Sequence, residues 1–205
     1  MTAEEIVDTK LKPIAENGFE DALEILQLIA LLKAQNSNNV NKGLSDVGAG
    51  RAAIVARNAF IARLTLLVVR CYAKPKNGDL HIRKAFDLIA NDSRVSEELS
   101  RRNPAGALTD TQSIWFSCRC DNRLHYLKHF RDKYTAHFSE PNADIPLPKY
   151  DELFPFAIET TKVMEALAKA VGVNSHNLND WNDEIAGSAE AFWKPWASQV
   201  INVKK

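Results

Sequence analysis

The chain has 205 residues, of which 45% are hydrophobic and 25% are charged, as is typical of a soluble globular protein. Its 26 Lys and Arg residues are balanced by 26 Asp and Glu residues, which argues against a broad nucleic-acid-binding surface but leaves room for a local basic groove. The three cysteines have no paired spacing, which argues against a disulfide framework, and this length suits one well-buried domain rather than two.

The N-terminal residues MTAEEIVDTK are acidic and lack the apolar centre of a signal peptide. The longest apolar stretch, within residues 59–69, is interrupted by Arg63 and is shorter than the roughly 20 residues that a helix needs to cross a bilayer. We therefore expect a cytoplasmic protein without membrane contact, in which the cysteines stay reduced.

Helical periodicity begins near the N-terminus. Residues 3–16 are predicted to be helical with an interruption at Pro13, because proline lacks the backbone N–H that a helix interior needs. Residues 19–34 carry apolar side chains at every third or fourth position, which predicts a helix with one buried face. Residues 36–50 are rich in Asn and Gly and are expected to form a loop.

The middle of the chain contains a long apolar segment and two shorter ones. Residues 49–73 predict a long buried helix, which the Pro and Gly of residues 74–78 should end. Two shorter helices are expected at residues 80–90, capped by Asp79, and at residues 93–102, capped by Ser93.

The second half of the chain also reads as helix. A long helix is expected from Thr109 to Phe138, because a Thr-x-x-Gln capping box marks its start. A Pro-rich connection over residues 142–148 leads to a helix at residues 150–171, and the last helix should cover residues 181–200. With no convincing strand, the sequence predicts an all-α, single-domain bundle of about seven helices.

The segment Arg131-Asp132-Lys133-Tyr134-Thr135-Ala136-His137, near the end of the long helix, contains a candidate catalytic pair. Arg131 supplies a permanent cation whose planar fork of donors fits phosphate, and His137 can move a proton near neutral pH. A phosphate clamp beside a proton shuttle suits RNA cleavage. On a straight helix these two residues would lie about 120° apart around the axis and about 9 Å along it. Either the helix bends near His137, or two copies of the helix form the site.

The segment LKHFRDKYTAHF resembles the Arg-(Asn/Asp/His)-x4-His signature of HEPN domains, and its ending is similar to the abortive-infection type U branch of that family. Residues 57–89 resemble the two helices that precede the motif helix in that branch. The resemblance implies one HEPN-like domain over residues 1–205. Its core would cover about residues 49–172, with N-terminal helices and a loop in residues 1–48 and an extra C-terminal helix in residues 173–205.

The resemblance further implies a metal-independent endoribonuclease without a cofactor. Such a protein could be the toxin or effector of a phage-defence or toxin–antitoxin system and could have an antitoxin protein as partner. Arg131 would bind the phosphate, His137 would be general acid or base, and Asp132 would orient its neighbours. A homodimer is also implied, in which motif helices from both copies line one cleft for RNA. Weaker candidates for RNA contact are Lys128, Lys133 and Arg123.

Two other interpretations of the motif region remain open. His125, His129 and Asp132 have i, i+4 and i+7 spacing on one helix face, which could hold a metal ion for a hydrolase. Alternatively, the protein is a non-catalytic HEPN-like module for dimerisation or binding.

Two further surfaces have alternative explanations. The arginines of residues 49–73, together with Arg119 and Arg123, could line an RNA groove or could pair with acidic side chains. The apolar stripe of residues 185–200 could dock on the bundle or bind a partner.

Overall fold

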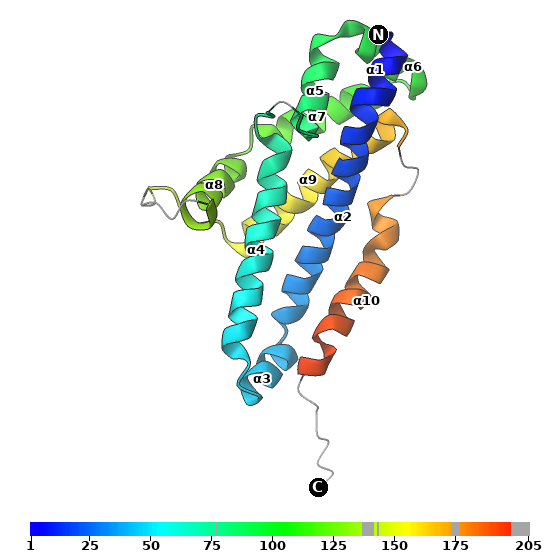
Figure 1. The fold of residues 1–205 in the computed structure, drawn as a ribbon. Coiled ribbons are helices and arrows are strands. Elements are labelled where there is room, and N and C mark those ends of the chain that lie inside the picture. Colours follow the sequence, from blue (N-terminus) through cyan, green and yellow to red (C-terminus); the bar gives the residue numbers. More distant parts are fainter. Residues whose placement is uncertain (77, 137–141, 143, 174–176, 198–205) are drawn as a thin grey trace.

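The computed structural model describes residues 1–76, 78–136, 142, 144–173 and 177–197 (Figure 1). In these ranges every regular element is helical, and the chain forms an all-α, single-domain bundle, as the sequence predicts. The elements are α1 (Ala3–Ile6), η1 (Val7–Leu11), α2 (Lys12–Gln35), α3 (Asn38–Asp46), α4 (Gly50–Tyr72), α5 (Ile82–Asn91), α6 (Ser93–Arg102), α7 (Ala107–Arg119), α8 (Asn122–Phe130), η2 (Arg131–Ala136), α9 (Tyr150–Val171), η3 (Leu178–Trp181), α10 (Asn182–Trp193) and η4 (Lys194–Trp196).

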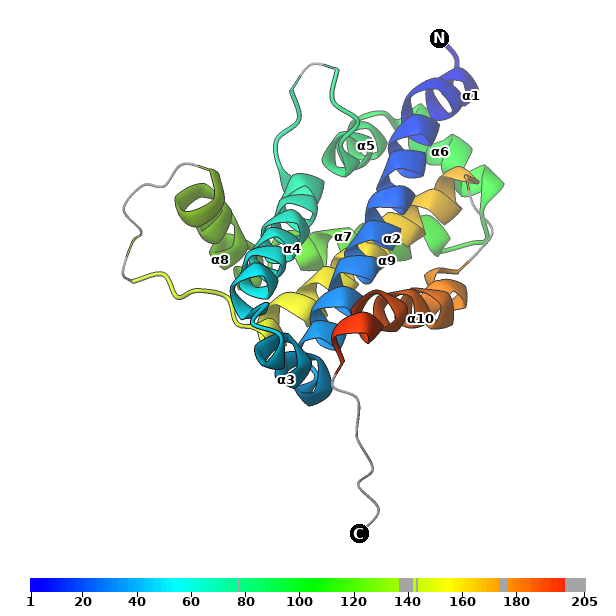
Figure 2. The same ribbon diagram turned by 60° about the horizontal axis from the view of Figure 1, so that its bottom comes forward.

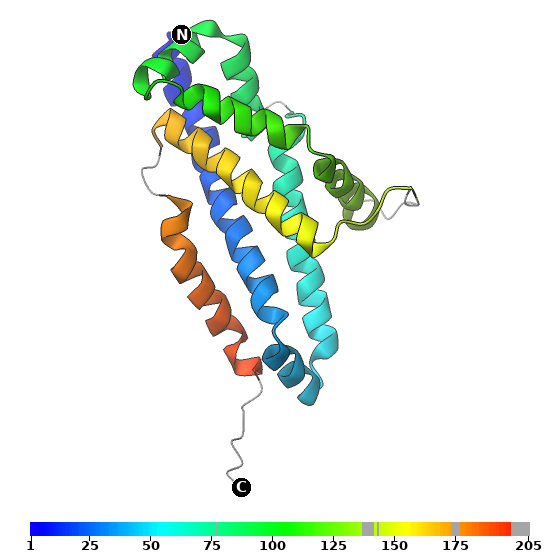
Figure 3. The same cartoon turned by 180° about the vertical axis from the view of Figure 1, so that it is seen from behind.

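The long helix α2 is the centre of the bundle and packs against α4, α9 and α10 (Figures 1 and 3). The helix expected at residues 19–34 is therefore longer, and the expected interruption at Pro13 is absent because α1, η1 and α2 follow one another directly. Pro13 lies in the first turn of α2, just after a wide π-helical turn at η1. A proline is tolerated at this position, since the first N–H groups of a helix have no partner within it.

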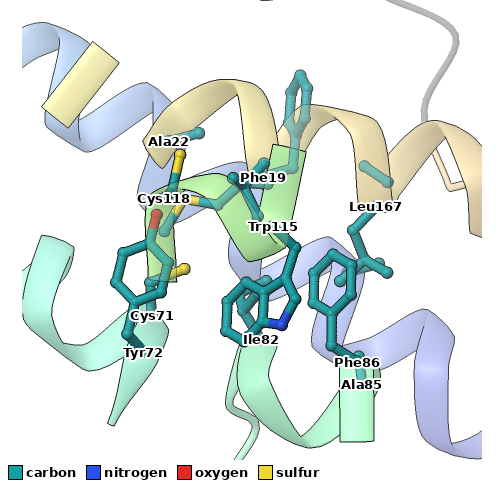
Figure 4. Close-up of a cluster of buried hydrophobic side chains, with 14 of the residues drawn as sticks. Phe19, Ala22, Cys71, Tyr72, Ile82, Ala85, Phe86, Trp115, Cys118 and Leu167 are labelled. Atoms are coloured by element: carbon teal, nitrogen blue, oxygen red, sulfur yellow. The ribbon is translucent and has the colours of Figure 1, made fainter. Parts of the chain in front are cut away.

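An aromatic stack holds α4, α5, α7 and α9 together (Figure 4). The Trp115 ring lies between Phe86 and Tyr72 (Figure 4): it is nearly parallel to Phe86, with centroids 4.4 Å apart, and stacks on Tyr72 at 5.1 Å. The Tyr72 hydroxyl forms a 3.1 Å hydrogen bond with the hydroxyl of Thr160 on α9, and both residues are buried. Apolar burial therefore fixes these helices together, while the buried Tyr72 and Thr160 hydroxyls satisfy each other.

The prediction of a loop at residues 36–50 is wrong, because the helix α3 occupies most of this segment (Figure 2). Ser37 caps α3 by accepting a hydrogen bond from the backbone N–H of Val40 at 3.4 Å. Val40 and Leu44, one helical turn apart, are buried in a small cluster with Trp193 of α10. Tertiary burial of this i, i+4 pair outweighs the low helix propensity of the Asn and Gly residues.

The long helix expected at residues 49–73 is confirmed as α4, but its first half is not buried. Ile54 and Val55 are 48% and 69% exposed, and only 33% of the most apolar 18-residue window is buried. Within the ranges described, α4 is also the one helix that is long and apolar enough to cross a bilayer. This differs from the prediction that Arg63 interrupts the apolar stretch and leaves no such helix. A single helix of this kind is weak evidence for a membrane span, since core helices of soluble proteins share these properties.

Two arginines of α4 pair with acidic residues of α2. The Arg63 guanidinium donates to both carboxylate oxygens of Glu24 at 2.6 and 2.7 Å, which lowers the pKa of Glu24. Arg70 forms the equivalent contact with Asp21. For Arg63 and Arg70, the structure therefore favours the explanation by ion pairs between helices rather than an RNA groove.

The last helix, α10, docks on α2. Trp193 is buried, and its indole N–H donates to the backbone carbonyl of Leu31 at 3.0 Å. The helix is shorter than the expected 181–200, because η3 precedes it and η4, which contains Pro195, follows it. Docking on the bundle therefore explains part of the apolar stripe, while Phe192 and Trp196 remain 55% and 43% exposed.

Candidate active site

The long motif helix expected from Thr109 to Phe138 is broken into two helices. It begins two residues earlier than expected, after Gly106, whose φ of 88° suits a glycine. It then ends at Arg119, and α8 starts after Asp121, whose carboxylate accepts a 2.7 Å hydrogen bond from the N–H of Arg123. Asp121 is thus an N-cap inside a segment that had been predicted as continuous helix.

This break changes which side chains reach the core. On a continuous helix, Phe116, Cys120 and Leu127 would share a buried stripe. In the structure Leu127 is buried, whereas Phe116 is 52% exposed and Cys120 is exposed. Leu124 joins Leu127 instead, so α8 contacts the bundle through its own short apolar face. Figures 1 and 2 place α8 at the edge of the molecule, on the outer side of α4.

The motif itself begins a π-helical turn. Residues Arg131–Ala136 form η2, which directly follows α8 and packs against α4. A π turn closes hydrogen bonds to the fifth residue, so the spacing of about 100° per residue does not apply beyond Phe130. His137 lies outside the described residues, and its position relative to Arg131 stays a prediction. Short π segments within helices are frequently found at functional sites.

Arg131 is held by its neighbour in the sequence. Its Nε–H donates to one carboxylate oxygen of Asp132 at 2.7 Å, and its Nη2 atom lies 2.6 Å from the same oxygen in an ion pair. This contact holds the guanidinium group in place and, among the residues described, leaves the Nη1 hydrogens for a ligand. The Arg131 side chain is 26% exposed, so these donors can still be reached from solvent.

Lys128 adds a positive charge near Arg131, and Arg83 and Arg119 also act on it. Burial lowers the pKa of the Lys128 ammonium, and the charges of Arg131, Arg83 and Arg119 lower it further, while Asp132 opposes this effect. The cations come from α5, α7, α8 and η2. Arg83 pairs with Asp87 at 3.6 Å and Arg131 pairs with Asp132, whereas in the described ranges Lys128 and Arg119 form no ion pair. A locally basic surface therefore exists in a chain whose formal net charge is zero.

The other two candidate RNA-contact residues differ from each other. Lys133 is half-buried and forms no ion pair with any residue that the structure describes. The Arg123 guanidinium instead binds the carboxylates of Asp121 and Glu159 and lies 5.1 Å from the ring centre of Phe156, and the two carboxylates raise its pKa. Arg123 thus connects α8 to α9, and of the two Lys133 has the less engaged charge.

The predicted metal ligands do not come together. His125 is exposed, His129 is half-buried with an unpartnered Nε2 atom, and Asp132 binds Arg131. Over the residues described, no group of three or more His, Cys, Asp or Glu side chains could hold a metal ion. The physical reason is that the π turn displaces Asp132 from the i+7 position that a regular helix would give it.

Sequence reasoning missed Arg83 altogether. It lies in α5, far from the motif in the chain, and its effect on Lys128 arises only because α5 and α8 approach each other. No local pattern marks such a residue. The break at Asp121 did have a local signal, since an Asp followed by a polar residue is a common start of a helix.

The all-helical bundle and the Arg131–Asp132 pair at the motif are the features that the sequence resemblance to HEPN domains implies. A comparison with family models agrees, because the HEPN AbiU2 model, described as AbiU2, matches residues 8–192. The chain therefore belongs to the AbiU2 family of HEPN domains. The match covers the motif region and α5, and it extends over η1, α2, α3 and most of α10. Neither a curated protein nor a solved structure gave a match.

Proposed function

We propose that this protein is a metal-independent endoribonuclease of the HEPN type, acting in the cytoplasm as a toxin or effector in phage defence or a toxin–antitoxin system. One observation carries the proposal: among the residues that the structure describes, the Arg131 guanidinium is held by Asp132, keeps Nη1 donors for a ligand and lies near Lys128, which has no ion pair there. A locally basic surface with an oriented phosphate-binding group suits a polyanionic substrate. We also propose that the HEPN core comprises residues 49–172 and that residues 1–48 and 173–205 flank it.

In the proposed reaction, His137 removes the proton from a ribose 2′-hydroxyl. The 2′-oxygen then attacks the adjacent phosphorus, and the bond from phosphorus to the 5′-oxygen breaks. A second His137, from the partner copy, donates a proton to the leaving 5′-oxygen. The products are a 2′,3′-cyclic phosphate and a 5′-hydroxyl end, and Arg131 stabilises the charge that builds up on the phosphoryl oxygens.

The need for both an acid and a base supports a homodimer as the active form. A symmetric pair of chains would supply two copies of Arg131 and His137 to one cleft, through an isologous interface. The position of α8 at the edge of the molecule is compatible with such pairing. A toxin of this kind also needs a partner protein that restrains it, and we propose an antitoxin in that role.

The experiment is cleavage of a mixed-sequence RNA by the purified protein, with and without a chelator. We expect cleavage in both conditions, products with 2′,3′-cyclic phosphate ends, and a loss of at least a hundredfold in His137→Ala and Arg131→Ala. Arg101→Ala is the matched control, since Arg101 is an exposed arginine that pairs with Glu98 on α6. Intact RNA in both conditions, or equal activity of all four proteins, would refute the proposal.

A second candidate is a non-catalytic module for dimerisation or binding. The exposed aromatic side chains of Phe192 in α10 and Trp196 in η4 favour it, since such side chains are common at protein interfaces. This candidate predicts that wild-type protein does not cleave RNA. It also predicts a dimer or a complex with a partner that Trp196→Ser abolishes and that Arg131→Ala leaves intact. Analytical ultracentrifugation measures the complex in each variant, and the RNA assay described above measures cleavage.

A further inference from the structure

The outer face of α4 carries a row of exposed apolar side chains, which we call the α4 seam. It consists of Ala52, Val55, Ala59, Ala62 and Leu66, which follow one another at steps of three, four, three and four residues. Val55 is 69% exposed and Leu66 is 42% exposed, while Ala52 and Ala59 are exposed and Ala62 is partly buried. In a single chain the seam therefore faces solvent, and it includes none of the motif residues.

The spacing of the α4 seam is the one by which helices pack along each other. Alternating steps of three and four residues keep one stripe of a helix in contact with a neighbouring helix. The stripe extends over about 21 Å, since each residue adds 1.5 Å. The face that α4 turns to the bundle is a different one, on which Ala53, Leu64 and Leu67 are buried, and Figure 2 shows α2 and α9 on that inner side. The seam is thus a second packing face without a helix among the described residues.

The α4 seam matches a copy of itself when two α4 helices run antiparallel. Residues 55 and 66 are centred between positions 60 and 61, and so are residues 59 and 62. One two-fold axis at this centre therefore places Val55 of each chain opposite Leu66 of the other, and Ala59 opposite Ala62. The large side chains meet near the two ends, and the small alanines meet in the middle, where they let the backbones approach closely. Self-complementarity of this kind is what a symmetric dimer needs.

Charges along α4 favour the antiparallel arrangement over the parallel one. Arg51 is exposed at the N-terminal end of α4, where the helix dipole is also positive. A parallel pair would bring the two Arg51 side chains together, whereas an antiparallel pair places each beside the negative C-terminal end of the other helix. On the side toward α2, Arg63 is already neutralised by Glu24, and Arg70 by Asp21. These cations therefore do not oppose the contact.

A lipid bilayer is the other surface that could cover an exposed apolar face of a helix. Helices that lie on membranes carry large apolar side chains such as Trp, Phe and Leu on the face that enters the lipid. Three of the five seam positions are alanines, which add little apolar area for lipid but permit a close contact between helices. The seam therefore favours a second copy of the chain.

We infer that two copies of this chain associate through the α4 seam, with the helices antiparallel in an isologous interface. Because α4 also packs against η2, this pairing holds both motif segments on the same side of the two paired helices. The inference deepens the proposed function and rests on its homodimer, for which it supplies an interface. It assigns that role to Val55 and Leu66, which the sequence predicted to lie in a buried helix.

Sedimentation equilibrium of the full chain tests the inference. We expect wild-type protein to form a dimer. Val55→Asp and Leu66→Lys each place an unpaired charge opposite an apolar side chain, so each alone should raise the dimer dissociation constant roughly thirtyfold or more. Combined in one chain, the two substitutions place an acid opposite a base only when the helices are antiparallel. The double variant should then return to within about tenfold of the wild-type dissociation constant.

Phe192→Asp is the matched control, because Phe192 is 55% exposed on α10 and its substitution should leave the dimer unchanged. Val55 and Leu66 are exposed, so their variants should fold, and the melting temperature of each verifies this. A monomeric wild type, a dimer that both single variants keep, or a double variant that stays dissociated would overturn the inference. Loss of the dimer in Phe192→Asp alone would also overturn it.

Two further measurements separate this interface from its alternatives. Sedimentation with phosphatidylglycerol vesicles tests the bilayer: a monomer that binds them, and loses this binding in Val55→Asp, would place lipid rather than a second copy on the seam. RNA cleavage separates the interface from the nuclease. Intact RNA together with a seam-dependent dimer would refute the nuclease alone, whereas cleavage by a chain that stays monomeric would refute the interface alone.

Discussion

Asp121 both caps the helix that leads into the motif and binds Arg123, so Asp121→Ala should remove two interactions at once. An N-cap is worth about 1 kcal/mol. The ion pair adds roughly 0.2 to 1 kcal/mol, because both side chains are partly exposed, at 24% and 29%, and Arg123 keeps its contact with Glu159. We therefore expect the alanine variant to lose about 1 to 2 kcal/mol of unfolding free energy, measured by urea denaturation.

Asp121→Asn separates the two contributions. Asparagine caps helices as well as aspartate does but carries no charge, so this variant should lose less than about 1 kcal/mol. Arg123 lowers the pKa of the Asp121 carboxyl, which means that its charged form stabilises the folded chain. That stabilisation is present above the unfolded pKa, near 3.9, and is lost as the pH falls through the lower folded value. The difference between wild type and Asp121→Asn should therefore persist at pH 7 and disappear in strong acid.

Equal losses in the alanine and asparagine variants would show that the cap contributes nothing, and the break between α7 and α8 would need another explanation. An unchanged urea midpoint for the alanine variant would refute the reasoning completely. The slope of the unfolding transition should stay the same in all three proteins, because neither substitution alters the surface that unfolding exposes.

Two further predictions concern the core and the basic surface. Tyr72→Phe should lower the unfolding free energy, measured by urea denaturation, by about 1 kcal/mol, because it removes the hydrogen bond to Thr160 but keeps the stack on Trp115. Thr160 still donates to the carbonyl of Phe156 at 2.9 Å. A loss above about 3 kcal/mol would contradict this account of the stack. Lys128→Gln should weaken binding of single-stranded RNA and lower the slope of log affinity against log salt concentration by about one; an unchanged slope would show that Lys128 makes no phosphate contact.

The sequence predicted helices best where caps and breakers stand at both ends. Residues 150–171 form α9 with the expected bounds, since a Pro-rich approach precedes it and Gly172, with a φ of 76°, ends it. The helix at residues 93–102 also has the expected bounds, although its cap is Asp92 rather than Ser93. In both cases the information is local, and local signals are what a sequence pattern contains.

Predictions failed where packing decides. The helix α3 forms because Val40 and Leu44 find Trp193 of α10, which is distant in the chain. A single buried stripe running through Phe116, Cys120 and Leu127 assumes one continuous helix, whereas the chain starts a separate helix, α8, after Asp121. A helical wheel assumes one continuous helix, so one unrecognised cap displaces every residue on one side of it.

The candidate site was predictable in its residue types but not in its surroundings. Arg131 and Asp132 are adjacent in the sequence, and their contact gives Asp132 an orienting position beside the guanidinium. The approach of Arg83 and Arg119 to Lys128 depends on how three helices meet, which no spacing reveals. The role of His137 stays a prediction.

The π turn at η2 has a consequence for how this family can vary. It accommodates one residue more than a regular helical turn would, so a single deletion among residues 131–136 would let the turn relax to ordinary α-helix. The side chains beyond the deletion would then keep nearly the same direction relative to α8, because the wider turn had absorbed the residue that is removed. A deletion within α8 would instead rotate the whole motif by about 100°, so the loss of one residue should be tolerated in η2 far more readily than in α8.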